Sequence, residues 1–229
     1  MLLIGYGSWF FTRPAEPVYQ GRTLSQWFDQ IHDQVGTNKD PAVQAIRAMG
    51  KDAVPFLIQQ LRLSNQVYRQ TAIEYFNSYS GMKTYPNGWW HARASWCLHE
   101  LGDQAASTAP DLIAIAKNTN AIYREDAIFL LEQVHAPPEI TIPVLKDLLN
   151  DDNPQVLLSS ANVLAQHGPG AQSAVPTLIQ KWKELSAQIQ SAQARGGAYP
   201  SMKIHERRII GIDITKIDPA AAKKLGIEN

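Results

Sequence analysis

Residues 92–117 read ARASWCLHELGDQAASTAPDLIAIAK, and this stretch decides the fold. It contains Pro110, which is followed by Pro143 and Pro176 at intervals of thirty-three residues. Each of these prolines is predicted to begin a short apolar helix, and a second apolar helix in matching register precedes each one. Self-similarity at a fixed period of this length is typical of repeated helical units. The stretch from Ala92 to Trp182 therefore predicts a helical hairpin that recurs along the chain.

The first helix of each predicted unit carries one apolar stripe with helical spacing. In the first unit Asp40 is a predicted N-cap, Pro41 takes the first helical position, Gly50 ends the helix and Pro55 begins the return helix. Asn153 and Pro154 repeat this start, and Asp218 is predicted to cap a short closing helix. The five predicted stripes are Ala42, Ala45, Ile46, Met49; Ala94, Cys97, Leu98, Leu101; Ala127, Leu130, Leu131, Val134; Ser160, Val163, Leu164, His167; and Ile210, Asp213, Ile214, Ile217.

Two polar residues in these stripes need their own interpretation. His167 precedes Gly168, and we expect it to be a satisfied residue at a helix end. Asp213 stands where the other stripes have small or apolar residues. Two interpretations remain for Asp213: it pairs with Arg207 or Arg208 by way of a neighbouring helix, or, because its helix is near the end of the chain, it faces water.

The repeated pattern is a small residue, a run of apolar positions, a glycine, a short loop and then Pro-x-Leu. It resembles a HEAT repeat in the segments AVQAIRAMG…PFL, ASWCLHELG…PDL, AIFLLEQV…PVL and SANVLAQHG…PTL. The segment EPVYQGRTLSQWFDQI is similar to the start of bacterial HEAT-repeat proteins that often carry an N-terminal anchor. The resemblance implies an all-α fold, a right-handed α-solenoid (an α-α superhelix) of about five HEAT-like hairpins.

In such superhelices the return helices usually line the concave side, which is a surface for partners. The resemblance therefore implies candidate groove residues on the return helices: Gln59, Gln60, Arg62, Asp111, Lys117, Lys146, Asp147, Gln180 and Lys181. We single out Arg62, Asp111, Lys146 and Lys181 as candidate binding residues. Some HEAT-like proteins resemble lyases that attach bilin chromophores, and others resemble glycosylases that act on alkylated bases.

The predicted domain organisation has two parts. Residues 1–22 form an apolar N-terminal segment and a linker, and residues 23–229 form the solenoid, with insertions near 66–88 and 183–202. Two prolines make residues 13–21 an extended linker. Thr23 and Gln26 then have the spacing of a capping box at the start of the first helix. Residues 66–79 are predicted to be helical, and residues 81–88 to form a loop.

The apolar segment Met1–Phe11 is shorter than the roughly 20 apolar residues that a membrane span needs. Three interpretations remain: the tail of a truncated membrane anchor, an apolar arm that packs on the first helices, or a weak signal segment. The expected location is correspondingly the cytoplasm, or a membrane that the segment anchors.

Composition narrows the classes of partner. The chain has 229 residues, with 21 Lys and Arg against 21 Asp and Glu. A neutral balance argues against non-specific nucleic-acid binding, which needs a basic stripe. The single cysteine, Cys97, excludes an internal disulfide framework and occupies a small apolar repeat position. No cofactor motif is present, so we expect no cofactor. The neutral charge balance leads us to expect no nucleic acid as a partner.

The most unusual cluster in the sequence is Trp89, Trp90, His91 and Trp96. Tryptophan is favoured at binding hot spots, so the cluster is a candidate anchor for a partner. In the alternative, Trp90 and Trp96 fill space left by the insertion, and Trp89 is the most exposed member. His91 and His99 lie eight residues apart without a third ligand between them, so we expect no metal site.

These observations favour a non-enzymatic scaffold that binds another protein. The alternative is a HEAT-like enzyme or ligand-binding protein, which would be bilin-lyase-like or, less in keeping with the neutral charge, glycosylase-like.

Overall fold

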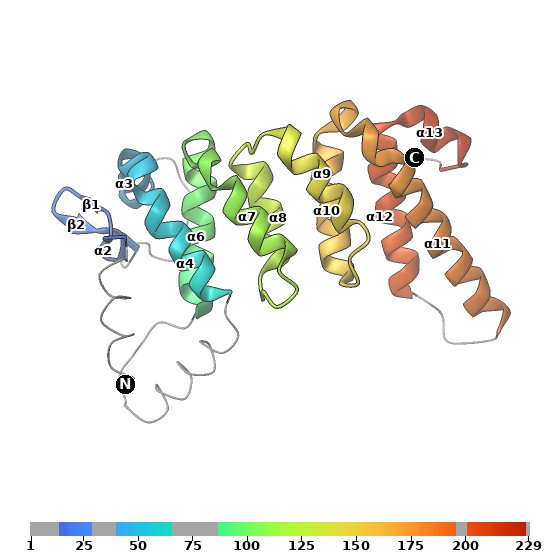
Figure 1. Ribbon diagram of the computed structural model, residues 1–229, viewed down its shortest axis with the longest axis horizontal. Helices are drawn as coiled ribbons and strands as arrows, with labels where there is room; N and C mark the ends of the chain where they lie inside the picture. The colour runs from blue at the N-terminus through green and yellow to red at the C-terminus, as the bar shows by residue number, and fades with distance from the viewer. Residues whose placement is uncertain (1–13, 29–39, 66–86, 196–200, 228–229) are drawn as a thin grey trace, which may run out of the picture. The chain divides into compact units, whose positions relative to one another are not determined.

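The computed structural model describes residues 14–28, 40–65, 87–195 and 201–227, and the described chain is almost entirely helical (Figure 1). It forms two compact units. The first comprises Met1–Tyr123 with Gln133–Ala136, and the second comprises Arg124–Glu132 with Pro137–Asn229. The prediction of an all-α protein is confirmed. The apolar segment 1–11, the predicted helix 66–79, most of the predicted loop 81–88 and the loop 196–200 lie outside the described residues.

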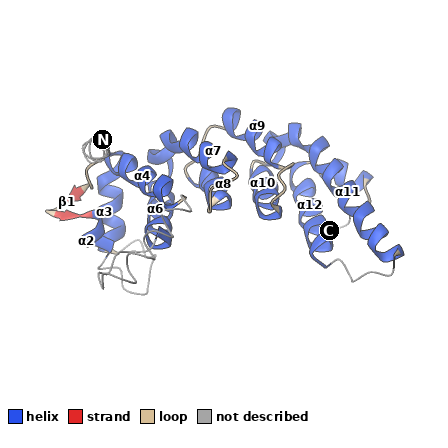
Figure 2. Ribbon diagram, turned by 60° about the horizontal axis from the view of Figure 1, so that its bottom comes forward, coloured by secondary structure: helices blue, strands red, loops and turns tan. Residues whose placement is uncertain are grey.

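The described part of the first unit begins with an irregular segment, residues 14–17, and a two-stranded hairpin replaces the rest of the predicted extended linker. Strands β1 (Val18–Tyr19) and β2 (Arg22–Thr23) pair antiparallel, and they are the red arrows of Figure 2. The turn between them places Gln20 at φ +48° and Gly21 at φ +73°. Two consecutive residues with positive φ suit the tight turn of a hairpin. The prolines precede the strands, so they remove no hydrogen bond from the ladder.

Helix α2 (Leu24–Phe28) follows directly and has the predicted capping box. The backbone amide of Thr23 donates to Gln26 Oε1 at 2.9 Å, and the amide of Gln26 faces Thr23 Oγ1 at 3.4 Å. Two donors that the helix cannot satisfy are thereby paired. Leu24, Trp27 and Phe28 are buried in the first unit.

Two pairs of consecutive helices complete the described part of the first unit. Helices α3 (Pro41–Met49) and α4 (Val54–Ser64) form the first, and α6 (Asn87–Leu101) and α7 (Ala109–Lys117) form the second. Asp40 caps α3 as predicted, because its side chain accepts from the amide of Ala42 at 2.8 Å. Helix α6 packs against both α3 and α4. The predicted stripes of α3 and α6 are buried.

The second unit contains helices α8 (Arg124–Gln133), α9 (Pro138–Leu148), α10 (Pro154–Gln166), α11 (Val175–Ala194), α12 (Ser201–Ile217) and α13 (Pro219–Lys224). Asn153 caps α10 and Asp218 caps α13, both as predicted. Helix α12 packs against α10, α11 and α13, and Figure 1 shows it between α10 and α11. Much of the predicted second insertion is helical, since α11 runs on to Ala194.

The prediction that Pro143 begins a helix is wrong. Helix α9 begins five residues earlier at Pro138, and Pro143 lies inside it. Pro138 takes the first helical position, where a proline loses no hydrogen bond. The first turn is closed by Thr141, whose amide and hydroxyl both donate to the carbonyl of Pro137 at 3.2 and 3.1 Å. A helix already started in this way tolerates the missing amide of Pro143.

The expectation that Asp213 faces water is also wrong. Asp213 is 1% exposed, and it shares the buried face of α12 with Glu206, Ile210, Ile214 and Ile217. Helix α12 packs against α10 and α11. These neighbours cover it, although it lies close to the end of the sequence. The register of the stripe was therefore correct, and the inference from chain position was not.

The hairpin turns share one backbone feature. Gly50, Gly102 and Gly168 each follow the first helix of a hairpin with φ of +56°, +49° and +53°, and each begins a short 3₁₀ turn. His135 occupies the same place after α8 with φ +48°. Glycine adopts this left-handed conformation without steric cost, whereas a side chain makes it unfavourable. Four connections between consecutive helices therefore contain a left-handed residue, and the three that have glycine there also share the 3₁₀ turn.

Candidate functional site

The predicted tryptophan cluster lies around one buried phenylalanine. The ring of Phe28 on α2 is 6.1 Å from that of Trp89, 6.4 Å from that of Trp90 and 6.5 Å from that of Trp96. Trp89 and Trp90 themselves meet edge to face at 4.8 Å, an attractive arrangement of aromatic rings. All three tryptophans are half-buried. They thus join α2 to α6 and still present part of their surface to solvent.

Sequence reasoning missed three residues of this cluster. Arg93 places its guanidinium 3.7 Å from the centre of the Trp89 ring, and Phe56 on α4 packs on Trp90 at 5.8 Å. The spacing of Trp89 and Arg93, one helical turn, was a usable signal for their contact. Phe28 and Phe56 come from distant parts of the chain, so only the folded unit brings them to the tryptophans.

His91 differs from its neighbours because it is buried. Its ring stacks on Tyr123 with the centroids 3.7 Å apart, and its two nitrogens lie 3.3 Å from Ser64 Oγ and 3.4 Å from Ser95 Oγ. Asn65 reinforces this corner by accepting from the amide of Tyr123 at 2.8 Å. These contacts give His91 a packing role inside the first unit.

The predicted return-helix residues lie in both units. Arg62 on α4 and Asp111 on α7 form an ion pair in the first unit. In the second unit Lys146 is half-buried on α9, and Lys181 on α11 lies 3.2 Å from Glu184. The structure therefore brings Arg62 and Asp111 together and leaves the two lysines on separate helices.

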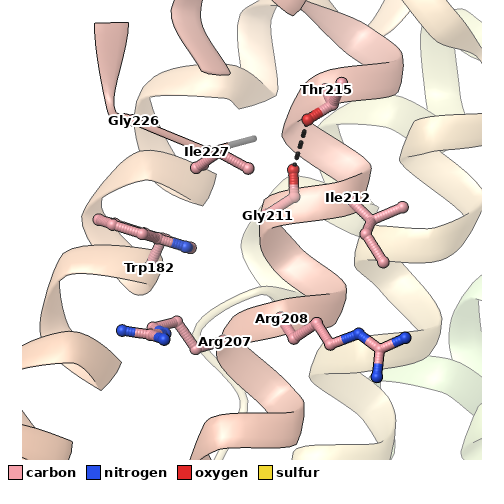
Figure 3. Close-up of a pocket in the computed structure, with 8 residues that line it drawn as sticks. All are labelled: Trp182, Arg207, Arg208, Gly211, Ile212, Thr215, Gly226 and Ile227. Carbon is pink, nitrogen blue, oxygen red and sulfur yellow. Dashed lines mark hydrogen bonds between the residues drawn. The ribbon is translucent and has the colours of Figure 1, made fainter. Parts of the chain in front are cut away.

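The second unit contains a pocket that sequence reasoning did not identify (Figure 3). It has a volume of about 520 Å³, which is within the range of ligand-binding pockets. Helix α11 supplies one side, α12 supplies the floor, and the segment after α13 supplies the other side. Its lining residues are Trp182, Arg207, Arg208, Gly211, Ile212, Thr215, Gly226 and Ile227.

Gly211 lies at the point where the three segments of the pocket meet. It is buried in the middle of α12, where glycine is less favourable than alanine by about 1 kcal/mol. A Cβ atom at this position would lie 3.4 Å from both Trp182 Nε1 and Ile227 Cγ2. Trp182 on α11 and Ile227 in the C-terminal segment therefore both meet the backbone of α12 at Gly211.

The polar groups of the pocket are mainly donors. The guanidinium of Arg207 lies 5.7 Å from the centre of the Trp182 ring, and Arg208 extends from the other side of α12 (Figure 3). Within the described part of the chain, arginine ion pairs are formed by Arg47, Arg62 and Arg124, and neither pocket arginine takes part in one. The hydroxyl of Thr215 donates to the carbonyl of Gly211 at 3.0 Å, so its proton is already used. The pocket therefore suits an anionic group.

Two other groups have shifted protonation equilibria for structural reasons. Burial raises the pKa of Asp213 to about 6, against the opposing effect of Lys216, whose Nζ is 3.6 Å from Asp213 Oδ1. Burial, reinforced by the charge of Glu100, raises the pKa of the Cys97 thiol well above its ordinary value. A thiol that resists ionisation is a poor nucleophile, which agrees with its predicted role as a small core residue.

Metal-ligand clusters and membrane-spanning helices are absent from the described residues. Within them, no group of three or more His, Cys, Asp or Glu side chains is arranged to hold a metal ion. Nor does any helix among them have the length and apolar character needed to cross a membrane. Comparisons with protein families, with curated proteins and with solved structures found no match to this chain.

Proposed function

We propose that this chain is a non-enzymatic protein-protein interaction scaffold, built from HEAT-like hairpins that stack into a right-handed α-solenoid. The observation that carries the proposal is the left-handed residue that recurs between consecutive helices. Gly50, Gly102, His135 and Gly168 all have φ near +50° between the two helices of a hairpin. Hairpins that turn in the same way present equivalent faces for stacking, which is the basis of solenoid architecture.

The core residues support the same proposal. Ala42, Ala94 and Ala127 are small and buried at equivalent positions of three hairpins, where they allow neighbouring helices to approach closely. One hairpin cannot bury its apolar face alone, so each repeat depends on its neighbours. The return helices α4, α7, α9 and α11 carry the polar side chains that a stacked array exposes to a partner.

The shifted ionisable groups give further support for a binding role. Asp213 and Cys97 belong to the packed interior, and burial is the largest cause of each pKa shift. Catalytic groups instead combine a shifted pKa with access to a cleft. The candidate binding surfaces are the aromatic cluster around Phe28 and the return-helix residues, including Lys146 and Lys181.

Affinity capture tests the proposal. The immobilised full-length chain is incubated with lysate of its source organism, beside a Trp89→Ala/Trp90→Ala variant and a Lys146→Glu/Lys181→Glu variant. A Lys51→Glu variant is a charge-change control, because Lys51 is exposed in the turn before α4. Circular dichroism checks that every variant is folded. A stoichiometric protein that one site variant loses and the control retains supports the scaffold, whereas capture of no protein by the parent chain contradicts it.

A further inference from the structure

The surroundings of the α11–α12 pocket are basic although the whole chain is neutral. Residues 175–227 contain nine of the 21 Lys and Arg residues but only four of the 21 Asp and Glu residues. Two of those four, Glu206 and Asp213, are buried in the core face of α12, where they pair with Lys203 and Lys216. The excess positive charge is therefore left on the surface of this part of the second unit.

The pocket concentrates that charge beside apolar surface. Trp182 and Ile227 form its walls, and the two guanidiniums of Arg207 and Arg208 lie at its edges. Arginine donors in a planar fork match the geometry of a carboxylate. Ile212, which also lines the pocket, is 44% exposed. A ligand with an apolar side chain next to a carboxylate can pack the side chain on Trp182 and Ile227 and pair the carboxylate with an arginine.

The directions of the two arginines distinguish between kinds of anion. Arg207 points toward Trp182, whereas Arg208 points away from it on the opposite side of α12 (Figure 3). One compact anion cannot accept from both guanidiniums when they diverge in this way. An extended chain with successive carboxylates can cross the pocket and meet each guanidinium in turn.

We infer that the pocket binds an acidic segment of a partner protein, in which carboxylate side chains alternate with apolar ones. The carboxylates accept from Arg207 and Arg208, and an apolar side chain packs between Trp182 and Ile227. This inference rests on the proposed scaffold function and names the chemistry of its partner.

Fluorescence anisotropy with defined peptides tests the inference on the full-length chain. The probe is a fluorescein-labelled peptide in which glutamate and leucine alternate, and the matched probe replaces every glutamate by glutamine. We expect binding of the acidic probe to weaken at least tenfold in an Arg207→Gln/Arg208→Gln variant. Binding should also weaken as sodium chloride is raised, because salt screens charge pairs at a surface.

A control variant separates the pocket from the general positive charge. Lys183→Gln/Lys223→Gln removes two charges from the same basic part of the chain without altering a lining residue, since both lysines are exposed and outside the pocket. We expect its affinity to remain within about twofold of the parent chain. Equal weakening by the two double variants, or equal binding of the glutamine probe, would overturn the inference.

Two further arms identify the source of the anion and separate this inference from the scaffold proposal. Inorganic phosphate that displaces the acidic probe at the same concentration as unlabelled peptide would show a simple anion site and overturn the peptide assignment. A folded Arg207→Gln/Arg208→Gln chain that captures its partner from lysate as well as the parent does would also overturn it, while leaving the scaffold intact. If the Arg207→Gln/Arg208→Gln variant loses the captured partner and the Lys183→Gln/Lys223→Gln control retains it, the result supports both the inference and the scaffold proposal.

Discussion

Replacing Asp213 by asparagine is expected to make the protein more stable at neutral pH. In the folded chain burial raises the pKa of this carboxyl from an ordinary value of 3.8 to about 6. The ionised carboxylate then lacks a full set of partners, because Oδ2 has no hydrogen bond within the described structure and only Lys216 lies near Oδ1. A neutral amide of the same shape removes the buried charge.

The sign and size of the effect follow from the two pKa values. Below pH 3.8 both the folded and unfolded chains are protonated at Asp213, and the carboxyl causes no penalty. As the pH rises toward 6, the unfolded chain ionises first, so the free energy of unfolding falls. The full loss above pH 6 is about 3 kcal/mol, and about 2 kcal/mol of it accrues between pH 4.5 and pH 7.5.

Urea unfolding followed by circular dichroism measures this difference directly. The Asp213→Asn variant and the parent chain are compared at pH 4.5 and at pH 7.5, so that any pH-independent effect of the amide cancels. We expect the variant to gain about 2 kcal/mol relative to the parent over this range. Asp152→Asn serves as a control, because Asp152 is exposed in the same unit and its replacement should have the same effect at both pH values. A pH-independent difference for Asp213→Asn would refute the reasoning.

Three further predictions concern single contacts. Arg124→Leu should lower the free energy of unfolding by about 3 kcal/mol, because Arg124 is 5% exposed and forms a bidentate pair with Asp151 at 3.0 and 2.5 Å. An unchanged urea midpoint would contradict this. His135→Gly should raise the free energy of unfolding by about 1 kcal/mol, because glycine adopts the left-handed backbone at this position without strain. The exposed pair of His135 with Asp103 is lost, but it contributes less. A lower melting temperature would contradict the argument from the left-handed backbone. Asp40→Ala should remove about 1 kcal/mol with the N-cap of α3, measured by thermal unfolding, whereas Asp40→Asn should restore most of it.

Features that depend on neighbouring residues could be predicted from the sequence. The caps at Asp40, Asn153 and Asp218 and the capping box at Thr23 are made by side chains within three residues of the amides that they satisfy. The buried stripes follow from helical spacing and from the need to bury apolar surface. The burial of Cys97 followed from the same register.

Other predictions failed because two local signals competed. Both Pro138 and Pro143 are possible helix starts, and only the closure of the first turn on the carbonyl of Pro137 decided between them. The prolines suggested an extended linker over residues 13–21, but the sequence Tyr19-Gln20-Gly21-Arg22 makes a turn that pairs the flanking residues.

The sequence by itself determined the all-α class, the caps, and which residues share a face of each helix, because these depend on contacts within one or two helical turns. Only the tertiary structure decided that Asp213 is buried, because its burial comes from the elements packed against α12 and not from its own helix. The tertiary structure also decided that Trp182, Arg207 and Ile227 form one pocket. These residues come from three segments, and packing at Gly211 brings them together where no local spacing relates them.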